Sequence, residues 1–430
     1  MEKGITPAAW LVRGPLPHGQ WRQVRTYGRK IDLGAVMRRP AGVWAELRAC
    51  LRSPRGEEAG VRVRCDGDAS LAVGGRAVAL TAQGDAWAGR LQLGAGDNEI
   101  VLTVGAQAPA RVVGMEIAAG AGARFVRCRP PGAGDPDHIS GVFLYWRPSM
   151  AAEGPREWDE RFAMLRRLGM DTLIVQFSVI EGTAYYPSEL YPPAAQGDID
   201  PTGEMLEAAS RAGVAVHLGV ASDEKRWWQI PYRPEEVPQY AAEESARNVE
   251  IARELIERYR DEEALAGIYL SHEIHLGEEW AGENMPHLAE LFNRMCDGVK
   301  GFAPELAVST APFFSLRGTI EQYERRWRAL LRETRLDILM LQDGVGCERN
   351  ITVDNMVPYY ESLARVCEET GVEFWTDLEL FDLKPPKVVA PEQVAVQLAR
   401  EAPYVSKVVA YSIADLTPEF AAALPNVRLA

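Results

Sequence analysis

The chain has 430 residues, of which 47% are hydrophobic and 25% charged, and its formal net charge is -14 at pH 7. This composition is typical of a soluble globular protein and excludes disordered or collagen-like chains. The acidic balance disfavours nucleic acid as a partner. The sequence contains no run of about eighteen apolar residues, so it predicts no membrane span. The start, MEKGITPAAW, lacks a basic segment followed by an apolar one. We therefore expect a cytoplasmic protein, or a secreted one if a leader precedes this sequence.

The first part of the chain consists of short strand-like runs separated by glycine and polar turns. In GVRVRC, for example, Val61, Val63 and Cys65 alternate with arginines, which indicates a half-buried strand. This pattern predicts a β-sandwich, jelly-roll-like, over residues 1–131. The segments Trp21 to Ala35 and Gly96 to Val104 resemble strands of galactose-binding-like jelly rolls. That resemblance implies a carbohydrate-binding module; the alternative is an accessory domain with only a structural role.

The stretch RPPGAGDPDH, Arg129 to His138, is rich in Pro and Gly and predicts a linker. From residue 138 to residue 430 the pattern changes to strands alternating with amphipathic helices, which predicts βα units around a parallel sheet. Eight strand candidates follow: Gly141 to Trp146, Thr172 to Ser178, Val214 to Val220, Gly267 to Ile274, Leu306 to Phe314, Ile338 to Gly344, Val372 to Phe381 and Val408 to Ile413. Eight is the number that closes a (β/α)8 TIM barrel.

Helical spacing of apolar residues supports this alternation. The predicted helices are Glu157 to Leu168, Glu243 to Arg260, Met285 to Val299, Ile320 to Leu331, Val353 to Glu369 and Pro391 to Arg400. The six cysteines include no CxxC pair and no Cys/His zinc spacing, so we expect reduced thiols and no metal site. A disulfide between Cys65 and Cys128 is the open alternative.

Acidic residues lie near the carboxyl ends of two predicted strands, where barrel enzymes place their chemistry. In VEFWTDLELF, alternation puts Trp375, Asp377 and Glu379 on one face. In GIYLSHEI, it puts Glu273 on a face that we expect to line the barrel mouth. Two carboxyl groups in one pocket suit glycoside hydrolysis, in which one protonates the leaving oxygen and the other attacks the anomeric carbon or activates water. Each acid could instead form an ordinary structural ion pair.

Further candidates for substrate binding lie near the same strand ends. Aromatic side chains could stack on a sugar or pack their loops: Tyr185, Tyr186, Trp227, Trp228 and Trp375. His217 and His272 could form hydrogen bonds with substrate or with neighbouring groups in the core. The segment HEIH, residues 272–275, lacks the spacing of a zinc-binding HExxH helix. Gln342 and Asp343 end the strand over 338–344, and we expect both at the mouth.

Several spaced blocks carry a family resemblance. They are GVFLYW, WDERFAMLRRLGMDTLIVQFS, YYPS, AGVAVHLGV, a following WW and GIYLSHEI, covering Ser140 to Ile274. Together they resemble the bacterial domain-of-unknown-function family 4434, whose members resemble TIM-barrel glycoside hydrolases. The resemblance implies a sugar-active barrel.

The positions of the acids are also similar to those in the large retaining clan of barrel glycosidases. That similarity implies that Glu273 is the acid/base and Glu379 the nucleophile of a retaining enzyme. Asp377 competes with Glu379 for this role. The clan has Asn directly before the first acid, where this chain has His272.

The sequence therefore predicts a glycoside hydrolase that needs no cofactor and acts on an oligosaccharide or polysaccharide. One alternative is a carbohydrate-binding barrel without turnover. Another is a metal-dependent barrel hydrolase, which the absence of an HxH pair in GVFLYW disfavours.

Overall fold

The computed structural model describes residues 4–14, 21–26, 29–36, 44–105, 111–131, 135–195, 197, 199–221, 224–347, 350–383 and 386–412. The chain forms two compact units. One comprises Met1–Gly134 with Arg365–Glu373, and the other comprises Asp135–Ala364 with Phe374–Ala430.

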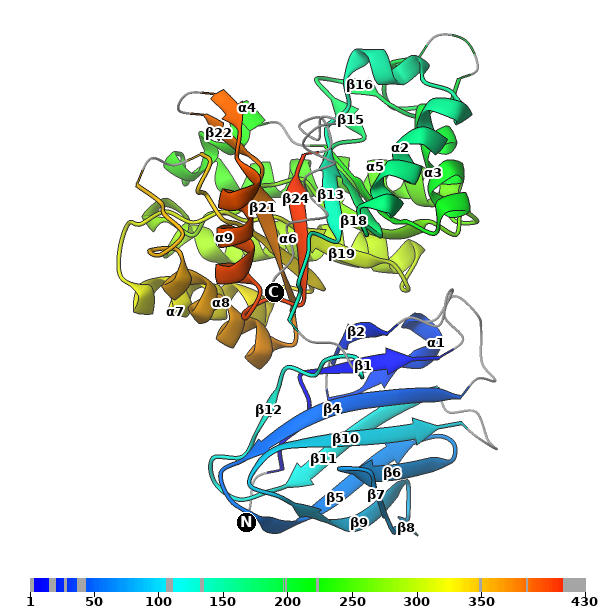
Figure 1. Ribbon diagram of the computed structural model, residues 1–430, viewed down its shortest axis with the longest axis vertical. Helices are drawn as coiled ribbons and strands as arrows, with labels where there is room; N and C mark the ends of the chain where they lie inside the picture. Colours follow the sequence, from blue (N-terminus) through cyan, green and yellow to red (C-terminus); the bar gives the residue numbers. More distant parts are fainter. Residues whose placement is uncertain are drawn as a thin grey trace. The chain divides into compact units, whose positions relative to one another are not determined.

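The first unit contains two antiparallel sheets (Figure 1). One has the order β2 (Arg22–Arg25), β1 (Ala9–Arg13), β4 (Ala45–Ser53), β10 (Gly96–Val104), β6 (Ala69–Val73), β7 (Arg76–Val78), with β12 (Arg124–Val126) also on β4. The other has the order β3 (Ile31–Asp32), β11 (Val112–Ala118), β5 (Glu57–Cys65), β9 (Ala86–Leu93), β8 (Leu80–Gln83), and a short helix, α1 (Leu33–Val36), follows β3.

Alternating side chains build the core of this unit. Along β4, Leu47 and Leu51 are buried, whereas Arg48 and Arg52 lie on the outer face. The pairing of Leu47 with Leu102 of β10 continues the same buried face across the sheet. The predicted β-sandwich is confirmed. Its carbohydrate-binding role stays a prediction. The ring of Trp21, an aromatic residue of this unit, lies within about 5 Å of the guanidinium groups of both Arg13 and Arg48.

The second unit is a closed parallel barrel, as predicted (Figure 1). In the described part of the chain it has eight strands in sequence order: β13 (Gly141–Leu144), β14 (Thr172–Val175), β17 (Ala215–Gly219), β18 (Leu265–Leu270), β19 (Ala307–Thr310), β20 (Ile338–Gln342), β21 (Glu373–Glu379) and β24 (Lys407–Tyr411). Pairing of β24 with both β13 and β21 closes it. The prediction ran past the observed end of β18, so Glu273 lies three residues beyond the strand. Ile413, in the last predicted strand, lies outside the described residues.

The longer helices lie between the strands as expected: α2 (Pro155–Arg167), α5 (Val237–Tyr259), α6 (Asn284–Phe302), α7 (Ile320–Glu333), α8 (Val357–Thr370) and α9 (Pro391–Glu401). Another helix, α3 (Pro201–Ala212), was not predicted. The residues at its two ends are typical helix caps and could have predicted it. Asp200 caps the first turn by accepting from the Gly203 amide, and Gly213 ends the helix with φ 66°.

Shorter elements complete the loops at the strand ends. They are 3-10 turns η2 (Pro148–Ala152), η3 (Ile230–Tyr232) and η4 (Glu278–Trp280), helix α4 (Glu224–Trp227), hairpin β15–β16 (Val179–Ile180, Thr183–Ala184) and hairpin β22–β23 (Phe381–Leu383, Pro386–Val388). All six cysteines are free thiols, so Cys65 and Cys128 form no disulfide. Among the described residues, no helix combines the length and apolar character needed to cross a bilayer.

Candidate active site

Strand β21 presents three side chains to the barrel interior, as its alternation predicts. Thr376, between them, faces the helix layer, where it bonds Tyr360 of α8 and Glu401 of α9. Trp375 is buried in the barrel core with Phe143 and Tyr269, and its ring lies 5.5 Å from the Lys407 ammonium at the start of β24. Trp375 therefore lies deep in the barrel and not at the mouth, where a sugar would bind, because it precedes the end of β21 by two pleats.

Glu379 ends β21, with a side chain that is 2% exposed. Its Oε2 accepts hydrogen bonds from the backbone amides of Gly346 (2.6 Å) and Cys347 (2.9 Å), in the loop after β20. Burial, followed by the negative charge of Asp343, raises the pKa of Glu379 to about 8 against the opposing effect of the two amides. The carboxyl group is therefore protonated at neutral pH.

Asp377 lies one pleat deeper than Glu379 on the same face. Burial raises the pKa of Asp377 well above its ordinary value, and the charges of Glu379, Asp343 and Glu273 add to this shift. No donor among the described residues reaches its Oδ1. Burial and these neighbouring charges therefore favour the neutral form of Asp377, which is buried to about the same extent as Glu379.

Glu273, half-buried in the loop after β18, joins the same cluster. Its charge contributes, after burial, to raising the pKa values of Asp377, Cys347 and Tyr269, so its carboxylate lies within electrostatic range of all three. The Trp227 indole Nε1 donates to the Glu273 carbonyl oxygen at 3.0 Å and fixes the main chain there. The structure therefore brings together Glu273, Asp377 and Glu379, although Glu273 is more than a hundred residues from the other two in sequence.

The two histidines expected at the site lie elsewhere. His272 is fully buried, and its Nε2 bonds Glu244 of α5 at 2.9 Å. Although burial opposes ionisation, His272 and Arg247 lower the pKa of Glu244 to about 2. His217 is buried inside the barrel, with Nδ1 3.0 Å from the Ser309 hydroxyl and its ring 5.9 Å from that of Trp375. Each histidine bonds a side chain within the protein, the alternative that the sequence left open, although His272 Nδ1 meets no partner among the described residues.

The adjacent indoles of the loop after β17 have different environments. Trp227 is buried against Trp280 and His272, at ring distances of 5.1 Å. Trp228 is 40% exposed, and its ring lies 5.5 Å from those of both His275 and Phe313. We call these three rings, Trp228, His275 and Phe313, the aromatic platform. Only Trp228 of this pair offers a face to a ligand.

Two further aromatic candidates pack their loop. Tyr185 is stacked on Trp146, with ring centroids 5.0 Å apart, and Tyr186 is buried and donates to Glu254 of α5 at 2.8 Å. Their rings pack the loop, one of the two alternatives that the sequence left open, and their contact with substrate stays a prediction.

Gln342 and Asp343 separate at the end of β20. Gln342 follows the inward-facing Met340 by two residues and donates to the Ala311 carbonyl oxygen at 3.2 Å. Asp343 is fully buried and bonds Gln397 of α9, so it faces the helix layer. The expectation that both line the mouth is therefore wrong for Asp343, because consecutive residues of an extended chain point in opposite directions.

Some residues of this region were missed from the sequence. Cys347 contacts the Glu379 carboxylate through its amide and thiol. Tyr411, at the end of β24, donates to Gln176 Oε1 at 2.9 Å, beyond the end of β14. His275 and Phe313 stack at 4.8 Å. Except for Cys347, these residues lie at or just past strand ends, so applying the strand-end rule to every strand would have found them.

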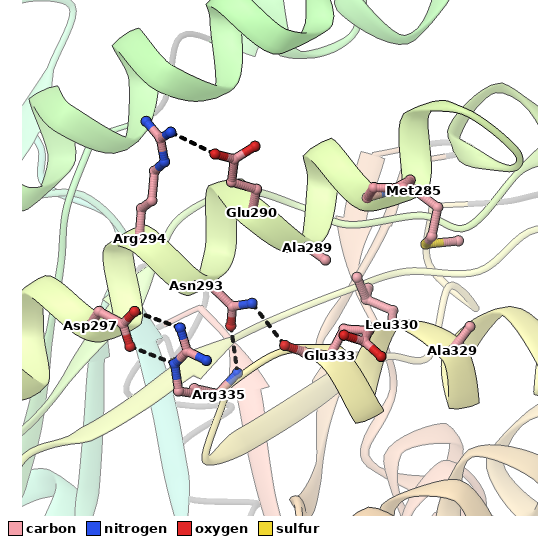
Figure 2. Close-up of a pocket in the computed structure, with 11 residues that line it drawn as sticks. Met285, Ala289, Glu290, Asn293, Arg294, Asp297, Ala329, Leu330, Glu333 and Arg335 are labelled. Atoms are coloured by element: carbon pink, nitrogen blue, oxygen red, sulfur yellow. Dashed lines mark hydrogen bonds and ion pairs between the residues drawn. The ribbon is translucent and has the colours of Figure 1, made fainter.

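Other features have no visible link to the carboxyl cluster. A cavity of about 540 Å³ lies outside the barrel between α6 and α7 (Figure 2). Four of its charged lining residues are paired with one another, since Arg294 bonds Glu290 and Arg335 bonds Asp297, each at 2.5 Å. Within the described ranges, no group of three or more His, Cys, Asp or Glu side chains is arranged to hold a metal ion.

Comparison with solved structures found proteins of similar fold. A protein from Bacteroides thetaiotaomicron provisionally assigned as an alpha-L-fucosidase is 18% identical, with a TM-score of 0.52 over 65% of this chain and 86% of its own. Alpha-L-fucosidase isoenzyme 2 from Paenibacillus thiaminolyticus is 16% identical, with a TM-score of 0.45 over 67% of this chain and 48% of its own. The GH2 beta-galacturonidase from Eisenbergiella tayi is 11% identical, with a TM-score of 0.41 over 95% of this chain and 89% of its own. At these identities the likeness concerns the fold alone.

No curated protein matches the chain. A family model described as a domain of unknown function, DUF4434, matches residues 139–422, which span the barrel and include Glu273, Asp377 and Glu379. The family resemblance found in the sequence is thereby confirmed, and the chain belongs to the DUF4434 family.

Proposed function

We propose that this protein is a glycoside hydrolase that cleaves a glycosidic bond with the carboxyl groups of Glu273 and Glu379. The observation that carries the proposal is a buried Glu379, bonded by two backbone amides, in the same cluster as the more accessible Glu273; burial raises the pKa of Glu379. Two carboxyl groups in different environments can divide the roles of acid and base between them. Position supports the proposal as well, because both lie at the carboxyl ends of barrel strands.

In the free enzyme we assign the proton to Glu379. Its pKa of about 8 keeps it protonated at neutral pH, as a general acid requires. Glu379 would protonate the leaving glycosidic oxygen while the Glu273 carboxylate attacks the anomeric carbon or accepts a proton from the attacking water. This distribution is the reverse of the one that the similarity to the retaining clan implies.

The substrate we propose is an oligosaccharide or polysaccharide. The aromatic platform presents the exposed indole of Trp228, and the neighbouring Trp227 holds the main chain of Glu273. Indole faces stack on the CH groups of pyranose rings and bury a large area with few rotamers. A sugar unit on Trp228 would therefore lie in the loop region that positions one of the two acids.

The test is hydrolysis of a panel of aryl glycosides, including alpha-L-fucosides, and of plant and microbial polysaccharides. We expect the native protein to release product from at least one of them. Glu273→Gln and Glu379→Gln should each lower kcat by roughly a hundredfold or more, since proton transfer contributes that much. Glu278→Gln, an acid in the same loop as Glu273 with no assigned role, is the matched control and should keep full activity. Unchanged hydrolysis in both site variants would contradict the proposal.

A further inference from the structure

Asp343 was expected to touch substrate, but its buried contacts connect the segments that hold Glu379. Its Oδ2 accepts from Gln397 Nε2 of α9 at 2.6 Å, and its Oδ1 accepts from the Val345 amide at 2.9 Å. The Val345 contact folds the loop that brings the next two amides, those of Gly346 and Cys347, onto Glu379 Oε2. Asp343 thereby supports the amides that bind the Glu379 carboxyl group.

The same carboxylate and its partner also hold the main chain of Glu379. The Glu379 amide lies 3.4 Å from Asp343 Oδ2, and Gln397 Nε2 donates to the Glu379 carbonyl oxygen at 3.2 Å. Asp343 also holds the strand two residues before Glu379, because its amide donates to the Asp377 carbonyl oxygen at 3.1 Å. Both the backbone and the side chain of Glu379 are therefore fixed through Asp343.

A second buried acid, Glu401 of α9, adjoins Asp343. Its Oε2 accepts from the Thr376 hydroxyl at 2.6 Å, whereas no donor in the described part of the chain reaches its Oε1. Both carboxyl groups are fully buried. Two neighbouring carboxylates cannot both ionise in such a site, and a proton on Glu401 lets this side chain donate to the Asp343 carboxylate. Burial raises the pKa of Glu401, and the Asp343 charge and this hydrogen bond add to that shift.

We propose that Asp343 is a positioning residue for Glu379, and that Asp343 and Glu401 hold a single proton between them, leaving one negative charge behind Glu379. Asp343 lies between the barrel wall and α9, and in this proposal it does not contact substrate. The consequence for catalysis rests on the proposed function, whereas the consequence for the protonation of Glu379 does not.

This fixed charge favours the protonated form of Glu379. Burial raises the pKa of Asp343 only to about 6, so between about pH 6 and pH 8 Asp343 is ionised while Glu379 keeps its proton. The other ionisable groups around Glu379 are Asp377 on its own strand, Cys347 in the loop after β20, Glu273 beyond β18 and Tyr411, its register partner on β24. Asp343 is the acid among them whose charge raises the pKa of Glu379 most.

The experiment is carbon-13 NMR of the full-length protein labelled at the side-chain carboxyl carbons of Asp and Glu, titrated with pH. The Glu379 signal is assigned by its loss in Glu379→Gln. In Asp343→Asn we expect Glu379 to titrate about one pH unit or more below the native value, because a neighbouring like charge has been removed. Glu392→Gln removes a charge from the first turn of α9, away from this pair, and should leave the Glu379 titration unchanged. An unchanged Glu379 titration in Asp343→Asn would overturn the proposal.

A measurement on the native protein covers the case in which Asp343→Asn does not fold. If one proton is shared, the Asp343 and Glu401 signals together should show one protonated and one ionised carboxyl group at pH 7. Two ionised or two protonated groups would overturn the proposal. Neither measurement uses hydrolysis, so a protein that cleaves no glycoside would contradict the proposed function and leave this inference standing.

Discussion

Glu379 combines two environments that act in opposite directions on its proton. The enclosed end of the barrel disfavours its charged form, whereas the amides of Gly346 and Cys347 favour it. Burial is the larger effect, so the side chain retains its proton at neutral pH. A structural role alone would not require an acid here, since glutamine could accept the same amide bonds.

This balance predicts a pH-dependent stability difference between the native protein and Glu379→Gln. The pKa of Glu379 is raised in the folded state, so between about pH 4.5 and pH 8 the unfolded chain releases a proton that the folded protein retains. The stabilisation that comes from the raised pKa of Glu379 is fully present below the pKa that Glu379 has in the unfolded chain. It is lost as the pH rises through about 8. The free energy of unfolding of the native protein should therefore fall relative to the variant by up to about 1.4 kcal/mol per pH unit.

Urea unfolding at about pH 5 and about pH 8 measures this difference. Glu278→Gln, which removes an acid outside the carboxyl cluster, should differ from the native protein by the same amount at both pH values. A difference between Glu379→Gln and the native protein that stays constant with pH would show that Glu379 ionises normally.

Among the structural elements, the turn after β20 is the one that binds Glu379 directly. A Cβ atom on Gly346 would lie 2.0 Å from the Phe381 carbonyl oxygen and 3.0 Å from Glu379 Oε2. Gly346 thus permits the close approach of this turn to the main chain after β21. Asp343 and Gln397 support the turn from the helix side.

Gly346→Ala should displace this turn and weaken the amide contacts to Glu379. We expect the free energy of unfolding to fall by roughly 1 to 3 kcal/mol, the usual cost of overpacking a tight site. The measurement is chemical denaturation. Gly301→Ala is the control, because its Cβ would meet no atom within 4 Å and should be neutral or slightly stabilising in helix α6. Equal stabilities of the two alanine variants would contradict the close approach at Gly346.

The alternation of side chains made the elements and the acidic face predictable. Hydrophobic periodicity located the barrel strands, and period two placed Asp377 and Glu379 on the inner face of β21. Periodicity carries no information on depth, so Trp375 was expected at the mouth although it lies in the barrel core. Periodicity is also unreliable where a strand ends. Asp343, directly after β20, was expected at the mouth but faces α9.

Contacts between distant segments could not be predicted from one sequence. The bond between His272 and Glu244 joins the loop after β18 to α5, and nothing in HEIH indicates such a partner. Similarly, the exposed Trp228 and the buried Trp227 are distinguished only by packing against η4 and Phe313. The family resemblance identified the barrel, but these partners required the structure.

For the whole molecule, the formal net charge of -14 makes the surface acidic on balance. Neutral sugars incur no repulsion from such a surface, whereas polyanions would. Membership of the DUF4434 family covers the barrel, and the sandwich unit lies almost entirely outside the matched residues. The central proposal therefore concerns the barrel, with Glu379 as the proton donor and Glu273 as the carboxylate.

The pH dependence of kcat/KM for a hydrolysed glycoside tests this assignment most directly. We expect kcat/KM of the native protein to fall tenfold per pH unit above about pH 8, where Glu379 loses its proton, and we expect Glu379→Gln to lose this limb together with most of its activity. A native rate that stays constant to about pH 9.5, or a Glu379→Gln variant that keeps both the native rate and the same basic limb, would contradict it.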